Sequence, residues 1–268
     1  MAGVTLLLKC QRTRPPCSMY DGRAVFRARS PLIRRLAPTP QQGLVDYQQQ
    51  SIVSQHMDTT MELVGQGKYV EAYEAWDAVW GDYPLGYPSL FTNWTGSTDT
   101  TNFLRTETPA SYVAWGSLVN TAAFHRGVHA GAQPFGVNGG LVYYNMRSDF
   151  MHSISPVMEP LLDNYKVLVY NGQVDPILGP HTGEAWMASL TWSGSKAWPD
   201  AARTVWHVTG TSDVGGFVKC VASVYLVVVR GAGHFVPADQ PARVCILCCC
   251  LHFACMTWVV VRSCRHTT

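Results

Sequence analysis

The 268-residue chain is long enough for one large domain, or two small ones, with a substantial hydrophobic core. Its composition, with 47% hydrophobic residues, 14% charged residues and a mean hydropathy of +0.01, is that of a soluble globular protein. The net charge is only +2, and eight basic residues fall within the first 40 positions, so the remainder carries no basic stripe of the kind that binds nucleic acid. We expect no nucleic-acid partner.

The first segment, residues 1–42, is basic and rich in proline, and it shows no sustained hydrophobic period. It predicts an irregular head. Its arginine-rich, acid-poor composition is faintly similar to an organelle transit segment, whereas the run "VTLLL" is too short for the core of a secretory signal. We favour an untargeted tail, or sequence wrongly joined to the domain.

Residues 41–80 contain few helix breakers apart from Gly65 and Gly67. Apolar residues recur at helical spacing on both sides of these glycines, so the stretch predicts a helical hairpin. Residues 83–109 are rich in Pro, Gly, Ser and Thr and predict a loop. This loop carries the sequon Asn93-Trp94-Thr95, which makes Asn93 a candidate glycosylation site.

Residues 111–165 combine short helical patterns with turns. The run "KVLVYNG" (166–172) is apolar and ends at Asn-Gly, which is typical of a buried parallel strand before a tight turn. After a helical stretch with a loop at 180–203, "TVWHV" (204–208) and "SVYLVVVRG" (223–231) predict two further strands. Buried strands with helical connections indicate the α/β fold class.

The last segment, residues 244–268, begins with 18 almost wholly apolar residues, 244–261. This is the minimum length of a membrane span. The cysteine triplet and the ending "VRSCRHTT" also resemble translated non-coding DNA. We favour this non-native origin over a membrane span, so contact with a membrane is expected only if residues 244–261 are native.

The nine cysteines are unevenly distributed. Two lie in the head, six lie in the last 24 residues, and only Cys220 lies in the long middle. A disulfide framework is spread through the fold that it stabilises, and this distribution is not. Cys245 and Cys248 have a zinc-like spacing, but their apolar neighbours provide no loop and no second ligand pair, so we expect no metal site and no cofactor.

Two residues with catalytic chemistry follow the two buried strands. Asp175 comes one turn after the strand at 166–172, and His234 follows the strand at 223–231 in "RGAGHFVPADQP". Singly, such an aspartate is usually a turn former and such a histidine a surface or packed residue. Together, at the carboxyl ends of two strands, they match the second half of the Ser…Asp…His order of α/β-hydrolases, with glycines that let the histidine loop turn sharply.

"KVLVYNGQVD" followed by "RGAGHFVPADQP" resembles the carboxyl-terminal signature of the serine carboxypeptidases, in particular their vitellogenic carboxypeptidase-like branch. Further matching segments, such as "QGKYVEAYEAWDAV", "HRGVHAG" and "GGFVK", extend the resemblance over residues 41–243. It implies part of an α/β-hydrolase fold with a helical insertion, and release of single residues from the carboxyl end of peptides. Asp175 matches the family's catalytic acid and His234 its catalytic base. The family is glycosylated and routed to the lysosome, the vacuole or the outside.

The chain also departs from the family. The family's nucleophile lies in a Gly-Glu-Ser-Tyr-Gly elbow upstream of the insertion, and no Gly-x-Ser-x-Gly occurs in these 268 residues. The segment "GTSDVG" (210–215) has its second glycine one place too late and lies between the aspartate and the histidine. Where relatives carry a cysteine pair in the insertion, this chain has Ser97 and Thr106.

These observations predict four segments: an irregular head (1–42), a helical insertion with its loop (43–110), the carboxyl-terminal part of an α/β-hydrolase domain (111–243) and an apolar, cysteine-rich tail (244–268). Because no nucleophile is found, we expect the polypeptide as written to be inactive, and we expect an open sheet edge to favour aggregation. Four hypotheses stay open: a truncated or misassembled serine carboxypeptidase, a non-catalytic peptide-binding remnant, a tail-anchored membrane protein, and one part of a two-chain enzyme.

Overall fold

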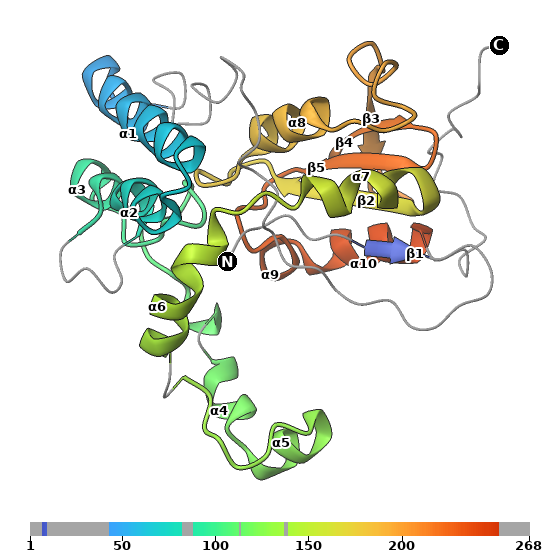
Figure 1. Ribbon diagram of the computed structural model, residues 1–268. Coiled ribbons are helices and arrows are strands. Elements are labelled where there is room, and N and C mark those ends of the chain that lie inside the picture. The colour runs from blue at the N-terminus through green and yellow to red at the C-terminus, as the bar shows by residue number, and fades with distance from the viewer. Residues whose placement is uncertain (1–6, 10–42, 82–87, 113, 137–138, 252–268) are drawn as a thin grey trace.

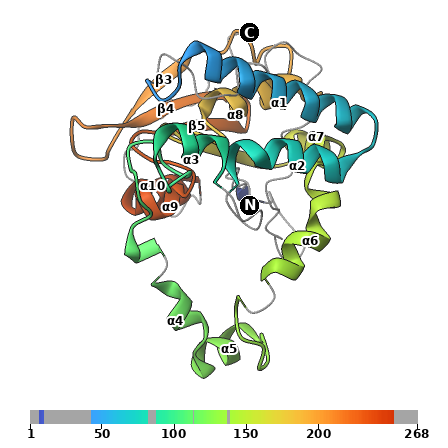
Figure 2. The same cartoon turned by 90° about the vertical axis from the view of Figure 1, so that its left-hand side faces the viewer.

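The computed structural model describes residues 7–9, 43–81, 88–112, 114–136 and 139–251 (Figure 1). A group of helices precedes a sheet that has helices on both faces, and a pair of short helices projects away from both. A ninety-degree turn of the view shows the same projection below the sheet and its helices (Figure 2).

The predicted helical hairpin is confirmed. Helix α1 (Tyr47–Gly65) begins after Asp46, whose carboxylate accepts a hydrogen bond from the Gln49 N–H at 2.8 Å, while Gln49 Oε1 accepts one from the Asp46 N–H at 2.9 Å. Helix α2 (Tyr69–Trp80) packs back against α1. Their facing apolar side chains, together with that of Phe91, form a core of their own, consisting of Val53, Met57, Val79, Trp80 and Phe91.

The sheet has the strand order β1-β2-β5-β4-β3. Strands β2 and β5 run parallel and adjacent, as the two apolar runs predict, with Val167 opposite Val224. The other neighbouring strands are antiparallel, so the sheet is mixed. The strands are β1 (Leu7–Lys9), β2 (Lys166–Gly172), β3 (Arg203–His207), β4 (Val214–Val221) and β5 (Val224–Val229).

Alternate side chains of β2 enter two different cores, because successive residues of a strand point to opposite faces. Val167 and Val169 pack with the helices of one face, and Leu168 and Tyr170 pack with those of the other. The first face is covered by α7 (Ser155–Asn164) and α8 (Pro180–Ser189), and the second by α9 (Val236–Asp239) and α10 (Pro241–Leu251). Helices on both faces of a sheet with a parallel central pair form the three-layer α/β arrangement (Figure 1).

The projecting part, residues 114–150, contains α4 (Trp115–Val119), α5 (Ala122–Val128) and α6 (Gly139–Phe150), and we call it the arm. Its end at α6 is anchored on α2, where the Tyr143 hydroxyl donates to Asp77 Oδ2 at 2.8 Å. Helices α4 and α5 extend away from the sheet and the hairpin (Figures 1 and 2).

Several elements were not predicted from the sequence, and three of them have a clear physical reason. The head is not wholly irregular, because Leu7–Lys9 form β1 against Lys166–Leu168; a three-residue strand is too short to show a period, and its hydrogen bonds come from β2. The predicted loop 83–109 contains helix α3 (Leu90–Thr95). Strand β4 was missed because its glycines obscure the strand pattern, whereas pairing with β3 and β5 on its two sides stabilises it.

Cysteine use also differs from the expectation. Cys220 on β4 is disulfide-bonded, so the argument against disulfides does not hold for this residue. Cys245 on α10 is a free, exposed thiol. Within the part of the chain that the structure describes, no helix is both long and apolar enough to cross a membrane, and residues 252–261 of the predicted span lie outside that part.

Candidate active site

Asp175 and His234 are in direct contact at the carboxyl ends of β2 and β5. His234 Nδ1 lies 2.9 Å from Asp175 Oδ2. Both residues are buried, with exposed fractions of 3% for Asp175 and 8% for His234. An ionised carboxylate can only accept, so the hydrogen of this bond belongs to Nδ1, and the imidazole has a fixed tautomer and orientation.

The turn after β2 holds the aspartate carboxylate by its second oxygen. Asp175 Oδ1 accepts hydrogen bonds from the backbone N–H groups of Ile177, at 2.8 Å, and Leu178, at 3.0 Å. The Val174 N–H donates to the Ala232 carbonyl at 2.8 Å, which joins this turn to the histidine loop. The pairing of β2 with β5 therefore determines how the two side chains meet.

The glycines of the histidine loop have the roles that the sequence indicates. Gly231 has φ +70°, a conformation that side chains rarely adopt. A Cβ at Gly233 would lie 2.3 Å from the Thr101 carbonyl oxygen, so only glycine fits there. This close approach lets the His234 N–H donate to the same carbonyl at 2.6 Å.

A partly buried network beside the histidine was not found by sequence reasoning. Asp239 accepts hydrogen bonds from Arg105 and Tyr112 on one oxygen, and from Asn102 and the Gly233 N–H on the other. Burial alone would raise the pKa of Asp239, but the hydrogen bonds from Tyr112 and Gly233 and the charge of Arg105 outweigh it and hold that pKa below its ordinary value. The only sequence signal was the aspartate within "HFVPADQP", which carries no indication of its partners.

Ser97 and Thr106 lie next to each other, as expected of two positions where relatives carry a cysteine pair. The buried Ser97 hydroxyl lies 3.3 Å from the Thr106 carbonyl oxygen and 3.1 Å from that of Arg105. The Thr98 N–H donates to the Thr106 carbonyl at 2.8 Å. Hydrogen bonds thus hold together two segments in the place where the family resemblance implies a disulfide.

The sequon residue Asn93 is exposed on α3 and not in an irregular loop. The Thr95 hydroxyl donates to the Phe91 carbonyl at 2.8 Å. Asn93 lies on the surface of the insertion, where a glycan would meet solvent.

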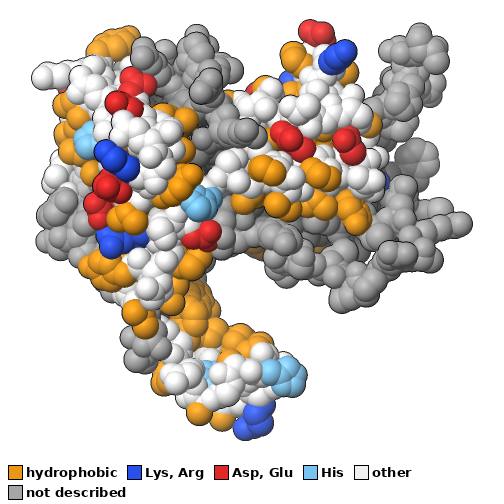
Figure 3. All heavy atoms as spheres, viewed as in Figure 1, with side chains coloured by type: hydrophobic (Ala, Val, Ile, Leu, Met, Phe, Trp, Pro, Cys, Tyr) orange, Lys and Arg blue, Asp and Glu red, His pale blue; other side chains and the backbone are white. Residues whose placement is uncertain are grey.

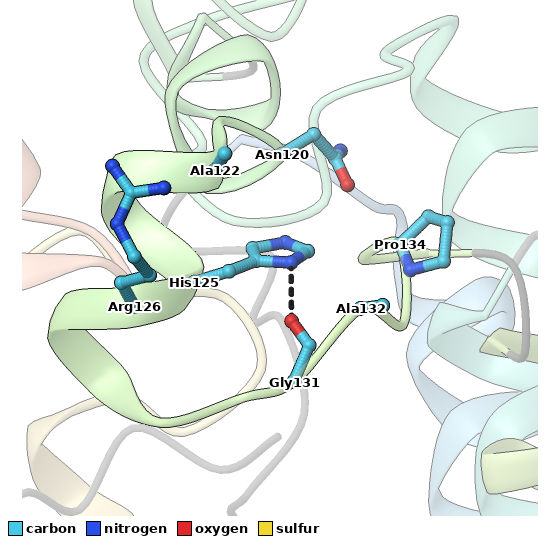
Figure 4. Close-up of a pocket in the computed structure, with 7 residues that line it drawn as sticks. All are labelled: Asn120, Ala122, His125, Arg126, Gly131, Ala132 and Pro134. Atoms are coloured by element: carbon cyan, nitrogen blue, oxygen red, sulfur yellow. Dashed lines mark hydrogen bonds between the residues drawn. The ribbon is translucent and has the colours of Figure 1, made fainter.

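A shallow cavity of about 490 Å³ lies on the arm, between α5 and the loop that follows it. Figure 4 shows the His125 ring pointing toward Gly131, to whose carbonyl His125 Nδ1 is hydrogen-bonded at 3.0 Å. The cavity is lined by residues between 120 and 134, so it contains neither Asp175 nor His234. Among the described residues, no group of three or more His, Cys, Asp or Glu side chains could hold a metal ion.

Comparison with known proteins identifies relatives of this chain. Residues 42–249 match the serine carboxypeptidase family model. The chain is 30% identical over 202 residues to a probable serine carboxypeptidase, CPVL, of Homo sapiens, and 33% identical over 202 residues to its namesake in Dictyostelium discoideum. It is 31% identical over 205 residues to a venom serine carboxypeptidase of Apis mellifera.

These alignments cover 75% of this chain but only 42%, 39% and 43% of the respective relatives, so the chain spans less than half of their length. Among solved structures, Kex1(Δ)p, a prohormone-processing carboxypeptidase from Saccharomyces cerevisiae, is similar with a TM-score of 0.56. That likeness covers 83% of this chain and 52% of Kex1 at 17% identity, and it shows a shared fold. The α/β-hydrolase fold predicted from the sequence is confirmed as a partial one.

Proposed function

This chain belongs to the serine carboxypeptidase family, and we propose that, together with a segment that carries the nucleophile, it releases single residues from the carboxyl end of peptides. The observation that carries the proposal is the buried hydrogen bond between Asp175 and His234. Its position at the carboxyl ends of two adjacent parallel strands is where α/β enzymes place their reactive groups.

In this mechanism His234 is the general base. Its Nε2 accepts the proton of the serine hydroxyl as the serine oxygen attacks the last peptide carbonyl, and it then gives that proton to the departing amine. Water, deprotonated by the same nitrogen, hydrolyses the acyl-enzyme and restores the serine. Asp175 keeps the imidazole in the required tautomer and stabilises the imidazolium that forms.

The 268 residues contain no Gly-x-Ser-x-Gly elbow, and we infer that this polypeptide alone has no peptidase activity. An Asp–His pair without a nucleophile cannot form the acyl-enzyme. The family resemblance places the elbow upstream of the insertion. Support for a missing partner segment comes from the arm, where nine of the fourteen exposed large hydrophobic side chains of the described structure are found.

Complementation tests this function. The chain is co-expressed with an upstream, elbow-bearing segment of a family member, and release of the terminal residue from a blocked dipeptide is measured. We expect activity in the pair and none in either part. His234→Ala and Asp175→Ala should each lower kcat by about 10⁴-fold or more, as in other serine-protease triads.

His207→Ala is the matched control, because His207 is an exposed histidine of β3 whose ring Nδ1 lies 3.2 Å from the Ser212 carbonyl oxygen, away from Asp175 and His234. It should retain activity within twofold. Undiminished activity in His234→Ala would overturn the site. A folded, soluble complex that binds peptides without cleaving them would instead favour the non-catalytic binding hypothesis.

We also infer that the protein enters the secretory route and carries a glycan on Asn93. The exposure of Asn93 and the existence of a venom relative support this. Expression in a secreting eukaryotic cell should give a protein whose mobility increases after glycosidase treatment. Asn93→Gln should abolish that change, and a treatment-insensitive wild type would contradict the inference.

A further inference from the structure

The carboxylate of Asp239 lies at the centre of the network beside His234. Its side chain is only 4% exposed, and both of its oxygens are occupied. Oδ1 accepts from Arg105 Nη1 at 2.7 Å and from the Tyr112 hydroxyl, while Oδ2 accepts from Asn102 Nδ2 at 3.1 Å and from the Gly233 N–H at 2.6 Å. Two of the four donors, Asn102 and Arg105, belong to the insertion, and Tyr112 lies directly after it.

The fourth donor, the Gly233 N–H, connects this network to the histidine. Gly233 immediately precedes His234, whose own N–H donates to the Thr101 carbonyl at 2.6 Å. Two successive backbone N–H groups of the histidine loop are therefore held by different groups, one by Asp239 and one by Thr101. These two bonds hold the backbone that carries the His234 side chain, whose Nδ1 lies 2.9 Å from Asp175 Oδ2.

Arg105 is itself held from its other side. Its Nε donates to Asp99 Oδ2 at 2.8 Å, and the Asp99 side chain is fully buried. Asp99 Oδ1 accepts from the Thr101 N–H at 2.8 Å. The chain of contacts thus runs from Asp99 through Arg105 to Asp239. At one end, Asp99 bonds Thr101, whose carbonyl accepts from the His234 N–H, and at the other end Asp239 accepts from the Gly233 N–H.

We propose that Asp239, locked by Arg105 and Tyr112, is a positioning residue that fixes the Ala232–Gly233 peptide, directly before His234, and so aligns the imidazole with Asp175. This rests on the proposed function in one respect only, which is that alignment matters because His234 is the base. Asp239 itself does not touch the reacting atoms. The insertion, through Arg105, then controls the geometry of the catalytic histidine in the sheet domain.

The test uses the full ¹⁵N-labelled chain without a complementing segment. It measures the exchange of the His234 Nδ1 hydrogen with water by NMR. The resonance is assigned by its loss in His234→Gln. We expect Asp239→Asn and Arg105→Gln to increase the exchange rate at least tenfold. Backbone amides of Val169 and Leu226 in the sheet core report global opening and should change by less than twofold at the same temperature.

Asp213→Asn is the matched control, because Asp213 also pairs with two arginines, Arg230 and Arg243, but does not contact Gly233. It should leave the exchange of the His234 hydrogen unchanged. Arg105→Lys keeps the charge but cannot bond Asp99 and Asp239 with one planar fork, so it should restore only part of the protection. If Asp239→Asn does not fold, Tyr112→Phe removes a single donor and should still give a measurable increase.

A purely structural role predicts the opposite pattern. The proposal is overturned if Arg105→Gln and Asp239→Asn accelerate the core amides and the His234 hydrogen by equal factors, or accelerate neither. In the complemented enzyme, Asp239→Asn should lower kcat at least tenfold with KM within twofold. The NMR result does not depend on catalysis, so failure of complementation and failure of the positioning role are distinguishable.

Discussion

The sheet and the arm contain similar side chains but bury them to different extents. In β2, six of seven residues are buried, and Trp198 beside the sheet is 0% exposed. In the arm, no described residue is fully buried, and Leu118 and Leu141 are 59% and 61% exposed. The space-filling view shows hydrophobic side chains on the surface of the arm (Figure 3).

This difference separates what the chain can stabilise by its own contacts from what it cannot. Both faces of β2 and β5 are covered by helices from the same chain, and the Asp175–His234 pair lies where these strands end. The arm is helical and has an apolar surface, but no other described part of the chain covers that surface. A patch of this kind on a monomer marks an interface.

Truncation of Trp198 should have the largest effect on folding. The indole packs edge-on against Trp192, with ring centroids 6.1 Å apart, in the core between the sheet and α7 and α8. Trp198→Ala should lower the free energy of unfolding by about 3–5 kcal/mol, measured by urea denaturation. Trp115→Ala in the arm, where the residue is 47% exposed, should change the free energy of unfolding by less than about 0.5 kcal/mol. Equal midpoints for the two variants would remove the distinction between the regions.

Acid titration examines the contact between the insertion and the sheet. The pKa of Asp239 is lowered in the folded chain, so its ionised form stabilises the fold above the ordinary aspartate pKa of about 4, and this contribution is lost as the pH falls through the lower folded value. At pH 7, Asp239→Asn should be about 2 kcal/mol less stable than the wild type, and the gap should narrow below about pH 4. Urea denaturation at a series of pH values measures the difference in the free energy of unfolding between the wild type and Asp239→Asn. A difference that does not depend on pH would contradict the role of the charge.

A disulfide between positions 97 and 106 should stabilise the insertion. The Ser97 hydroxyl lies 3.1 Å from the Arg105 carbonyl oxygen and 3.3 Å from that of Thr106, so hydrogen bonds hold the two segments together. Ser97→Cys with Thr106→Cys closes a loop of about ten residues, for which chain entropy predicts a gain of about 2.7 kcal/mol under oxidising conditions. The same variant after reduction is the control, and a gain that survives reduction would show that the cross-link is not its source.

The sequence predicted those features that depend on short-range pattern and on topology. Strands β2 and β5 are continuous apolar runs, and their parallel pairing brings Asp175 and His234 together without further information. The partners of Asp239 were not predicted, because Asn102 lies 137 positions away and only the folded chain brings it near. β1 was missed for the same reason, since its structure depends on β2.

Polar substitution in the arm should have the smallest effect on stability and the clearest effect on association. Leu118→Ser with Leu141→Ser removes two side chains that contribute little to the fold, so the free energy of unfolding should change by less than about 0.5 kcal/mol. Self-association, measured by sedimentation velocity, should fall, because the apolar surface that drives it is smaller. The matched control is Val205→Ser on the edge strand β3, where one exposed valine, 51% exposed, lies outside the arm.

If Val205→Ser reduces self-association as much as the arm variant does, the edge of the sheet takes part in self-association as much as the arm does. The arm would then not be distinguished from the sheet by its apolar surface. If only the arm variant reduces it, the same variant should also weaken complementation by the elbow-bearing segment. That second result would make the arm the place where the two halves of the domain meet, because loss of self-association and loss of partner binding would then have one cause. Unimpaired complementation would assign the arm to contacts between copies of this chain instead.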